Sequence, residues 1–221
     1  MKIYRPIKSN RVTQKFGENK ACIKTDVRRN IIYPTTVVGK RDKTCPVGFQ
    51  DFYKAMGLTG HNGLDNAIYM QEPLFFPFDV DNTTWHARHE IDRDGGLGVD
   101  VISDQPIEVL GTKSHIKLRF WHLDSTILHD GESVRFGQLI AFCGNSGASS
   151  GPHLHWSMKR CFKDGSAMDK TNGYIGAVDF APLYENQFTL DILGLKPPTL
   201  SIVQQLNRIV FNLRLLVYKL K

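Results

Sequence analysis

Two histidines, His153 and His155, stand one residue apart within the run Gly151–Trp156. Alternating residues of an extended strand point to the same face, so this spacing predicts that both imidazoles enter one space. Two neutral imidazoles side by side contribute little to a hydrophobic core. They become useful where one binds a metal ion and the other transfers protons.

A second group of metal-binding residue types precedes them, in the spacing His61-x-Gly63-x-Asp65. A histidine and an aspartate four residues apart can converge on one ion, and the glycine between them permits a tight backbone path. A catalytic zinc ion takes three protein ligands of these types and leaves a fourth position for water. His61, Asp65 and one of the pair His153 and His155 would complete such a set. The spacing alone does not say which of the two it is.

Short apolar runs separated by turn residues predict the elements that must position these groups. Six runs have the length and composition of strands, and glycine, asparagine and aspartate punctuate them. A seventh, Val12–Gly17, alternates before a glycine. The chain is therefore predicted to be mostly β. The six runs are Leu74–Phe78, Gly98–Ser103, Ile107–Leu110, His115–His122, Gln138–Cys143 and His153–Met158.

The order of these elements and motifs resembles the lysostaphin/LytM-type zinc endopeptidases, which cut the peptides of bacterial peptidoglycan. The resemblance runs from about Val12 to Met158 and implies a LytM-like antiparallel β-sheet or sandwich domain with long loops. The matching elements are Val12–Gly17, His61–Asp65, Glu72–Asp79, His122-Leu123 and the glycine-spaced run Gly131–His155.

The resemblance also implies a role for each site residue. His61, Asp65 and His155 would bind one zinc ion per chain, and His122 and His153 would be the unliganded catalytic pair. One of this pair would accept the proton of water as a general base. The two would also hydrogen-bond the developing oxyanion or protonate the leaving amine.

One residue of the family's pattern is not matched here. Some relatives carry a tyrosine that helps to stabilise the transition state shortly before the first metal ligand. Only Ala55 and Met56 stand near that place, and Tyr53 lies slightly earlier. The role of this tyrosine is therefore left unassigned in this chain.

The chain divides into a LytM-like domain, residues 1–190, and a hinge with a C-terminal helix, residues 191–221. Loop insertions are expected at about 20–60 and at 79–96, where they would form walls of a cleft. After Lys196-Pro197-Pro198 apolar residues recur at helical period among basic ones, which predicts an amphipathic helix. We expect this helix to dock on the domain or on a second copy, or to attach the chain to an anionic membrane or a larger assembly.

Composition limits the possible partners and locations. A net charge of +6 over 221 residues suits a polyanion such as a cell wall. Because no basic cluster carries interleaved aromatics, a nucleic-acid partner is not expected. No apolar run reaches the ~20 residues of a transmembrane span, and the N-terminus has no secretory signal pattern. The four cysteines match no zinc spacing and are expected to be free thiols, although a Cys22–Cys45 disulfide stays open.

The sequence thus predicts a zinc-dependent endopeptidase acting on stem or cross-bridge peptides of peptidoglycan. Without a signal peptide it is expected to be a phage endolysin or a virion-associated lysin, made in the host cytoplasm and acting at the cell wall. Two alternatives are a structural phage tail component, bound to tail proteins or to itself through the C-terminal helix, and a non-catalytic module that binds the wall or activates another hydrolase. His86 and His89 are expected to be surface residues rather than a second metal site.

Overall fold

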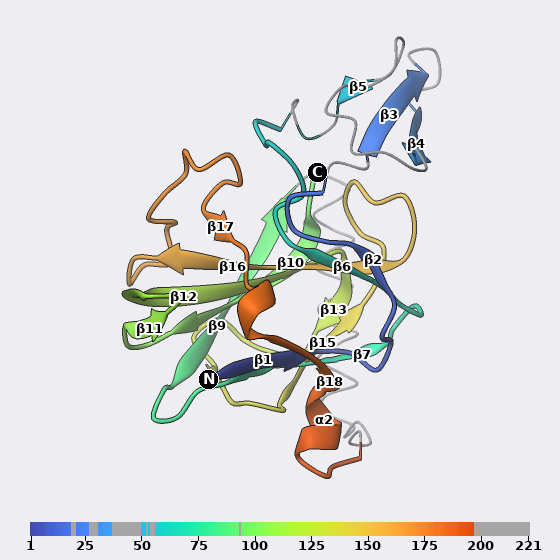
Figure 1. Cartoon of the computed structure of the whole chain (residues 1–221). Coiled ribbons are helices and arrows are strands. Elements are labelled where there is room, and N and C mark those ends of the chain that lie inside the picture. The colour runs from blue at the N-terminus through green and yellow to red at the C-terminus, as the bar shows by residue number, and fades with distance from the viewer. Residues whose placement is uncertain are drawn as a thin grey trace.

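The computed structural model of the chain describes residues 1–18, 21–26, 31–36, 50–51, 53, 56–92 and 94–196 (Figure 1). Strands make up nearly all of the regular structure, which confirms the predicted β class for this part of the chain. The strands are β1 (Lys2–Arg5), β2 (Val12–Gln14), β3 (Ala21–Asp26), β4 (Ile31–Thr36), β5 (Gln50–Asp51), β6 (Leu64–Ala67), β7 (Pro73–Phe75), β8 (Phe78–Asp79), β9 (Trp85–Asp92), β10 (Gly96–Ser103), β11 (Ile107–Val109), β12 (Thr112–Trp121), β13 (Leu123–Thr126), β14 (Ser133–Val134), β15 (Leu139–Cys143), β16 (His153–Cys161), β17 (Ala177–Val178) and β18 (Tyr184–Phe188). A 3-10 turn, η1 (Ala181–Leu183), and a short helix, α2 (Thr189–Ile192), complete them.

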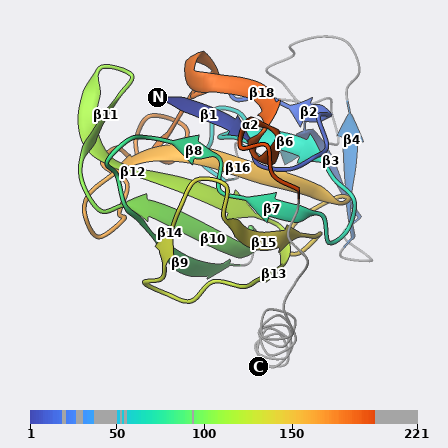
Figure 2. The same ribbon diagram turned by 90° about the horizontal axis from the view of Figure 1, so that it is seen from below.

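The main sheet is antiparallel and follows the order β14-β9-β10-β12-β16-β6-β2, with β11 attached to β12 and β17 to β16. The long strands β12 and β16 run side by side through its centre, as both views show (Figures 1 and 2). Their register pairs Trp121 with His155 and Phe120 with Trp156. This pairing places the end of β12 next to the two histidines of β16.

Successive side chains of β16 point to opposite faces of the sheet, so one face packs in the core and the other lines a pocket. Leu154, Trp156 and Met158 are fully buried in the hydrophobic core. The ring of Trp156 stacks on that of Phe120 at a centroid distance of 6.2 Å. The polar residues that alternate with these three line a pocket on the other face: His153, His155, Ser157 and Lys159. A single strand therefore contributes to both the core and the candidate site.

Three smaller sheets accompany the main one, in the orders β13-β15-β7, β18-β1-β8 and β4-β3-β5. Leu74 of β7 and Ile140 of β15 enter the same core as Trp156. The first strand, β1, pairs in parallel with β18 and antiparallel with β8. These contacts join the start of the described chain to residues near its end.

The expectation of a loop insertion at 79–96 is wrong in part, because this segment contains strand β9. All eight of its residues pair with β10, from Trp85 opposite Ser103 to Asp92 opposite Gly96. Trp85 and Ala87 are buried, whereas the histidines, arginine and acidic residues between and after them are at least partly exposed. A strand with one solvated face carries many polar residues, and that composition made the segment resemble a loop.

Three described stretches of residues 20–60 also differ from the irregular loop expected, since they form β3, β4 and β5. The predicted C-terminal helix lies outside the described residues from position 197 onward, and so does Cys45. Cys143 and Cys161 are free, buried thiols, as expected. Among the helices of the described residues, none has the length and apolarity needed to span a membrane.

Candidate metal centre

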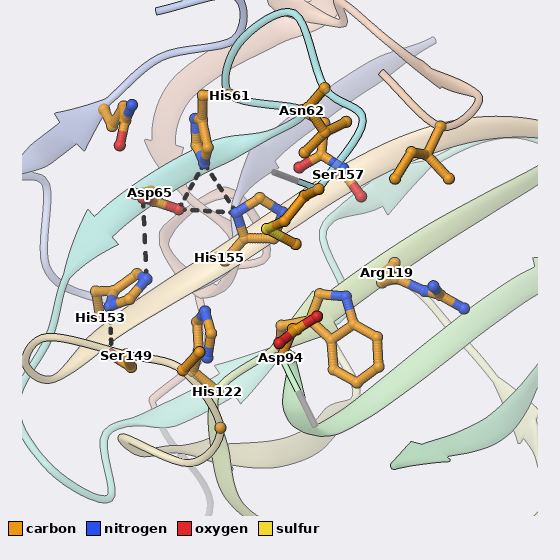
Figure 3. A pocket seen from close by; sticks show the side chains of 18 of the residues that line it. His61, Asn62, Asp65, Asp94, Arg119, His122, Ser149, His153, His155 and Ser157 are labelled. Atoms are coloured by element: carbon orange, nitrogen blue, oxygen red, sulfur yellow. Dashed lines mark hydrogen bonds and ion pairs between the residues drawn. The ribbon is translucent and has the colours of Figure 1, made fainter. Parts of the chain in front are cut away.

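The side chains of His61, Asp65 and His155 converge in the structure (Figure 3). The Nε2 atom of His61 lies 2.9 Å from Nδ1 of His155 and 3.0 Å from Oδ1 of Asp65. The same carboxylate oxygen lies 2.9 Å from Nδ1 of His155. Three atoms of metal-ligand type therefore form a nearly equilateral triangle.

Strand pairing brings two of these residues together. Asp65 of β6 stands directly opposite His155 of β16, so their side chains share one face of the main sheet. Gly63 precedes this pair and lies against the ring of His155. A Cβ atom at position 63 would stand 2.8 Å from Cε1 of His155 and 2.5 Å from the carbonyl oxygen of Trp156. The glycine of the motif is required because the imidazole occupies the space of a side chain.

His61 is held from its other side by the segment around residues 15–18. Its Nδ1 atom donates to the carbonyl oxygen of Lys15 at 3.1 Å. Its backbone is tied to the same segment, because Gly17 N donates to His61 O and His61 N donates to Glu18 O. A ring that donates through Nδ1 keeps its lone pair on Nε2, the atom that faces Asp65 and His155.

Burial and charge act on the two partners in opposite ways. Burial alone would raise the pKa of the Asp65 carboxyl, but the charges and hydrogen bonds of His61 and His155 outweigh it and hold this pKa well below its usual range. Burial lowers the pKa of His155, and the nearby carboxylate of Asp65 offsets that only in part. Near neutral pH Asp65 is therefore a carboxylate and His155 a neutral imidazole, the forms of these two groups that ligate metal ions.

The donor set fits a transition-metal ion. Two imidazole nitrogens and one carboxylate oxygen form a common ligand set of catalytic zinc sites. Bonds of ~2.0–2.2 Å in tetrahedral geometry place ligand atoms ~3.3–3.6 Å apart, about half an ångström wider than the triangle in this structure. The cluster could therefore bind one metal ion with small adjustments.

His122 lies beside this triangle in an unusual backbone conformation. Its φ of 61° is left-handed, which for a non-glycine residue costs ~1–3 kcal/mol and is typical of functional sites. The turn separates β12 from β13 and aims the ring at the cluster. Nδ1 of His122 donates to the carbonyl oxygen of Ser146 at 2.8 Å, so Nε2 carries the lone pair. Burial, followed by the charge of His153, lowers the pKa of His122 to about 4.

His153 faces His122 with a ring-centroid distance of 4.5 Å, while His122 and His155 are 6.3 Å apart by the same measure. Nδ1 of His153 donates to the carbonyl oxygen of Gly151 at 2.8 Å. Its Nε2 atom lies 3.9 Å from Oδ2 of Asp65. All five predicted site residues are thus brought together, three in the triangle and two beside it (Figure 3).

A pocket of about 590 Å³ contains this cluster. It extends along the polar face of β12 and β16, where Arg119, Ser157 and Lys159 line it. The sequence did not single out these residues, because only the strand register shows that they face the same space as the histidines. Tyr53, whose role was unassigned, also lines the pocket, with its ring centroid 6.1 Å from that of His61.

His86 and His89 belong to β9 rather than to a helix, so their spacing does not place both on one face. Nδ1 of His86 lies 2.6 Å from Oδ1 of Asp104, and Nδ1 of His89 lies 2.9 Å from Oδ1 of Asp130. Within the described residues, the triangle of His61, Asp65 and His155 is the one cluster of this kind.

Comparison with known proteins gives a family model and two curated relatives. The model of peptidase family M23 matches residues 101–170. An uncharacterized metalloprotease of Haemophilus influenzae is 30% identical over 98 residues, which cover 43% of this chain and 18% of that protein. The peptidoglycan DD-endopeptidase ShyB of Vibrio cholerae is 40% identical over 50 residues, 23% of this chain and 12% of that protein. The chain thus spans less than a fifth of the length of either relative.

Among solved structures, a zinc-containing peptidase from Vibrio cholerae superimposes with a TM-score of 0.44 and 18% identity. The superposition covers 72% of this chain and 36% of the other. The M23 model spans less than half of the chain, but it includes His122, His153 and His155. This match supports a peptidase family of the LytM type.

Proposed function

We propose that the chain is a zinc-dependent endopeptidase that hydrolyses peptide bonds in bacterial peptidoglycan. One observation carries the proposal: the triangle of His61, Asp65 and His155 lies in a pocket together with the rings of His122 and His153. The M23 model and the short stretch shared with a peptidoglycan DD-endopeptidase support the same reaction and substrate.

The five side chains divide the chemistry between them. His61, Asp65 and His155 would hold the metal through Nε2, Oδ1 and Nδ1. When bound, zinc supplies a Lewis acid that makes water acidic and polarises a peptide carbonyl. His122 and His153 each keep a lone pair on Nε2, because each donates through Nδ1 to a backbone carbonyl. One of them accepts the proton of the attacking water. The protonated ring then donates a hydrogen bond to the oxyanion or transfers its proton to the leaving amine.

The phage setting expected from the sequence is a proposal separate from this chemistry. It concerns where the enzyme acts, as a free endolysin or as part of a virion. Lysis or tail genes beside its own gene would support this setting. A place among chromosomal genes for wall synthesis would contradict it and leave the chemistry untouched.

The reaction is tested by digesting purified cell walls with the full chain. We expect new free amino groups without new reducing sugar ends, loss of this activity on chelation, and recovery on adding zinc. Unchanged activity after complete metal removal would contradict the proposal. Walls left intact by a zinc-loaded chain would instead favour the non-catalytic wall-binding module.

A further inference from the structure

The pocket continues beyond the histidines to a group of cationic side chains. His155, Ser157 and Lys159 alternate along one face of β16, and all three line the pocket. On β12 the paired residues are Trp121, Arg119 and Lys117, in that order. One row of side chains therefore leads from the candidate metal ligands to Arg119 and Lys159.

A buried carboxylate neutralises part of this charge. Asp100 is completely buried and accepts two hydrogen bonds from Arg119, at 2.6 and 2.7 Å. Lys117 lies 3.2 Å from the same carboxylate, and Arg88 lies 3.4 Å from it. Glu90 adds a second carboxylate, 2.9 Å from Arg88 and 3.4 Å from Arg119. These two carboxylates are shared among three cations.

Lys159 adds a further positive charge without a carboxylate of its own among the described residues. Its Nζ atom donates to the backbone carbonyl of Ile175 at 2.9 Å, which satisfies one hydrogen bond but does not neutralise the charge. The residue is only 5% exposed. A buried ammonium that lacks a counter-ion is unfavourable, and a negatively charged ligand in the pocket would relieve it.

The groups around Lys159 disfavour its charged form on balance, as expected for an ammonium that is not neutralised. Burial, and then the nearby cations Arg119 and Lys117, lower its pKa to about 8, while Asp100 and Glu90 act in the opposite direction. Asp92 and Asp94 also line the pocket, but both are exposed to solvent. Water screens these two carboxylates, so they do not replace a counter-ion at the buried ammonium.

We propose that Lys159, with Arg119 beside it, forms a subsite that binds a carboxylate of the peptide substrate. The proposal rests on the endopeptidase function proposed above and narrows its substrate class to acidic peptides. His155 and Lys159 are four residues apart on a strand, ~13 Å, which an extended peptide of about four residues spans. Stem peptides with free carboxylates satisfy this requirement, and bridges built from glycine alone do not.

The test compares two synthetic stem peptides that differ only in whether their internal carboxylates are free or amidated. For the zinc-loaded full chain we expect kcat/KM to be about tenfold higher for the free acid, mainly through KM, since a hydrogen bond between charged groups contributes this much. Lys159→Met should abolish the preference, and Lys159→Arg should retain most of it. Lys163→Met, at an exposed lysine just beyond β16, is the matched control and should keep the preference in full.

A pH series adds a second readout that needs no variant. The preference for the free acid should fall as the pH rises above about 8, because Lys159 loses its proton while Arg119 stays charged. The measured quantity is the ratio of kcat/KM for the free peptide to kcat/KM for the amidated one. Catalytic groups that titrate in the same way with both peptides do not change this ratio.

Equal cleavage of the two peptides, or an unchanged preference in Lys159→Met, would overturn the subsite and leave the endopeptidase standing. Failure to cleave either peptide, with cell walls also left intact, would overturn the endopeptidase itself and the subsite with it.

Discussion

His153 and His155 are successive residues on the pocket-facing side of strand β16, yet their surroundings differ. His155 is enclosed between Asp65 and His61, with its Nδ1 atom in the triangle. His153 lies nearer the open pocket, and its Nδ1 atom is engaged by the carbonyl oxygen of Gly151. On these neighbours we base the proposal that His155 binds the metal and that His153 moves a proton.

Alanine variants separate these two roles. His155→Ala removes a ligand, so we expect the zinc content to fall from near one per chain toward zero, together with activity. His153→Ala should keep its zinc and lose ~10²–10⁴-fold in kcat, the range of general acid-base catalysis. Metal analysis of the purified variants and rates on cell walls measure both effects.

The matched control is His129→Ala, because His129 is exposed and lies outside the pocket. It should keep both zinc and activity. Loss of zinc from His153→Ala, with zinc retained in His155→Ala, would reverse the assignment.

The buried ammonium of Lys159 also predicts a dependence of stability on pH. An unfolded lysine titrates near ~10.4, while in the folded chain the pKa of Lys159 is lowered to about 8. Between these two values the unfolded chain binds more protons than the folded chain, so the stability of the fold rises with pH. Below about 8 Lys159 is charged in both states, and the whole destabilisation from burying its ammonium is present. Lys159→Met should therefore be more stable than the natural chain by ~1–3 kcal/mol at pH 7, with the difference vanishing above pH ~10.5. Urea unfolding at several pH values measures this, and a less stable variant at pH 7 would refute it.

At the scale of elements, strand pairing determines the geometry of the site. Pairing of β6 with β16 sets Asp65 opposite His155, and pairing of β12 with β16 sets Trp121 opposite the same residue. The tight approach of Gly63 to His155 depends on this register. A change of backbone position at either strand would move a ligand atom.

Gly63→Ala tests that dependence. Its Cβ atom would press on the ring of His155 and on the backbone of Trp156, so the imidazole must shift. We expect zinc affinity to fall ~10–100-fold, the effect typical of losing a group that orients a ligand, with the fold retained. Competition with a fluorescent chelator measures the affinity. Gly151→Ala, where a Cβ atom meets nothing within 4 Å, should leave it unchanged.

Local patterns predicted the β class, the long strands β10, β12, β15 and β16, and the candidate ligands His61 and Asp65 with the pair His153 and His155. The role of His122 was implied by the family resemblance instead. Alternation was readable in β16, where Leu154 and Trp156 separate polar neighbours. It was missed in β9, because one face of that strand is polar and only Trp85 and Ala87 mark its buried side. Arg119 and Lys159 were not predicted as pocket residues, since their proximity to His155 depends on cross-strand register, which no local pattern encodes.

At the scale of the molecule, the candidate site joins segments that are far apart in the chain. The carbonyl of Lys15 holds His61, β6 carries Asp65, the turn at His122 follows β12, and β16 provides His155. A ligand that binds all of these segments stabilises the folded state as a whole.

Zinc should therefore raise the thermal midpoint of the full chain. At a free concentration of 100 times the dissociation constant, the gain is ~2.7 kcal/mol, or about 5–10 °C for a protein of this size. Calorimetry of metal-free and zinc-loaded protein measures the shift. His155→Ala should show little or none, and an equal shift in that variant would mean that the stabilising zinc binds elsewhere.

The most direct test of the central claim is a crystal structure of the zinc-loaded chain with anomalous diffraction collected on both sides of the zinc absorption edge. We predict one zinc peak, bonded to Nε2 of His61, Oδ1 of Asp65 and Nδ1 of His155, with the rings of His122 and His153 beside it and unbonded. A peak bonded to His153 in place of His155, or no zinc peak at this triangle, would contradict the account.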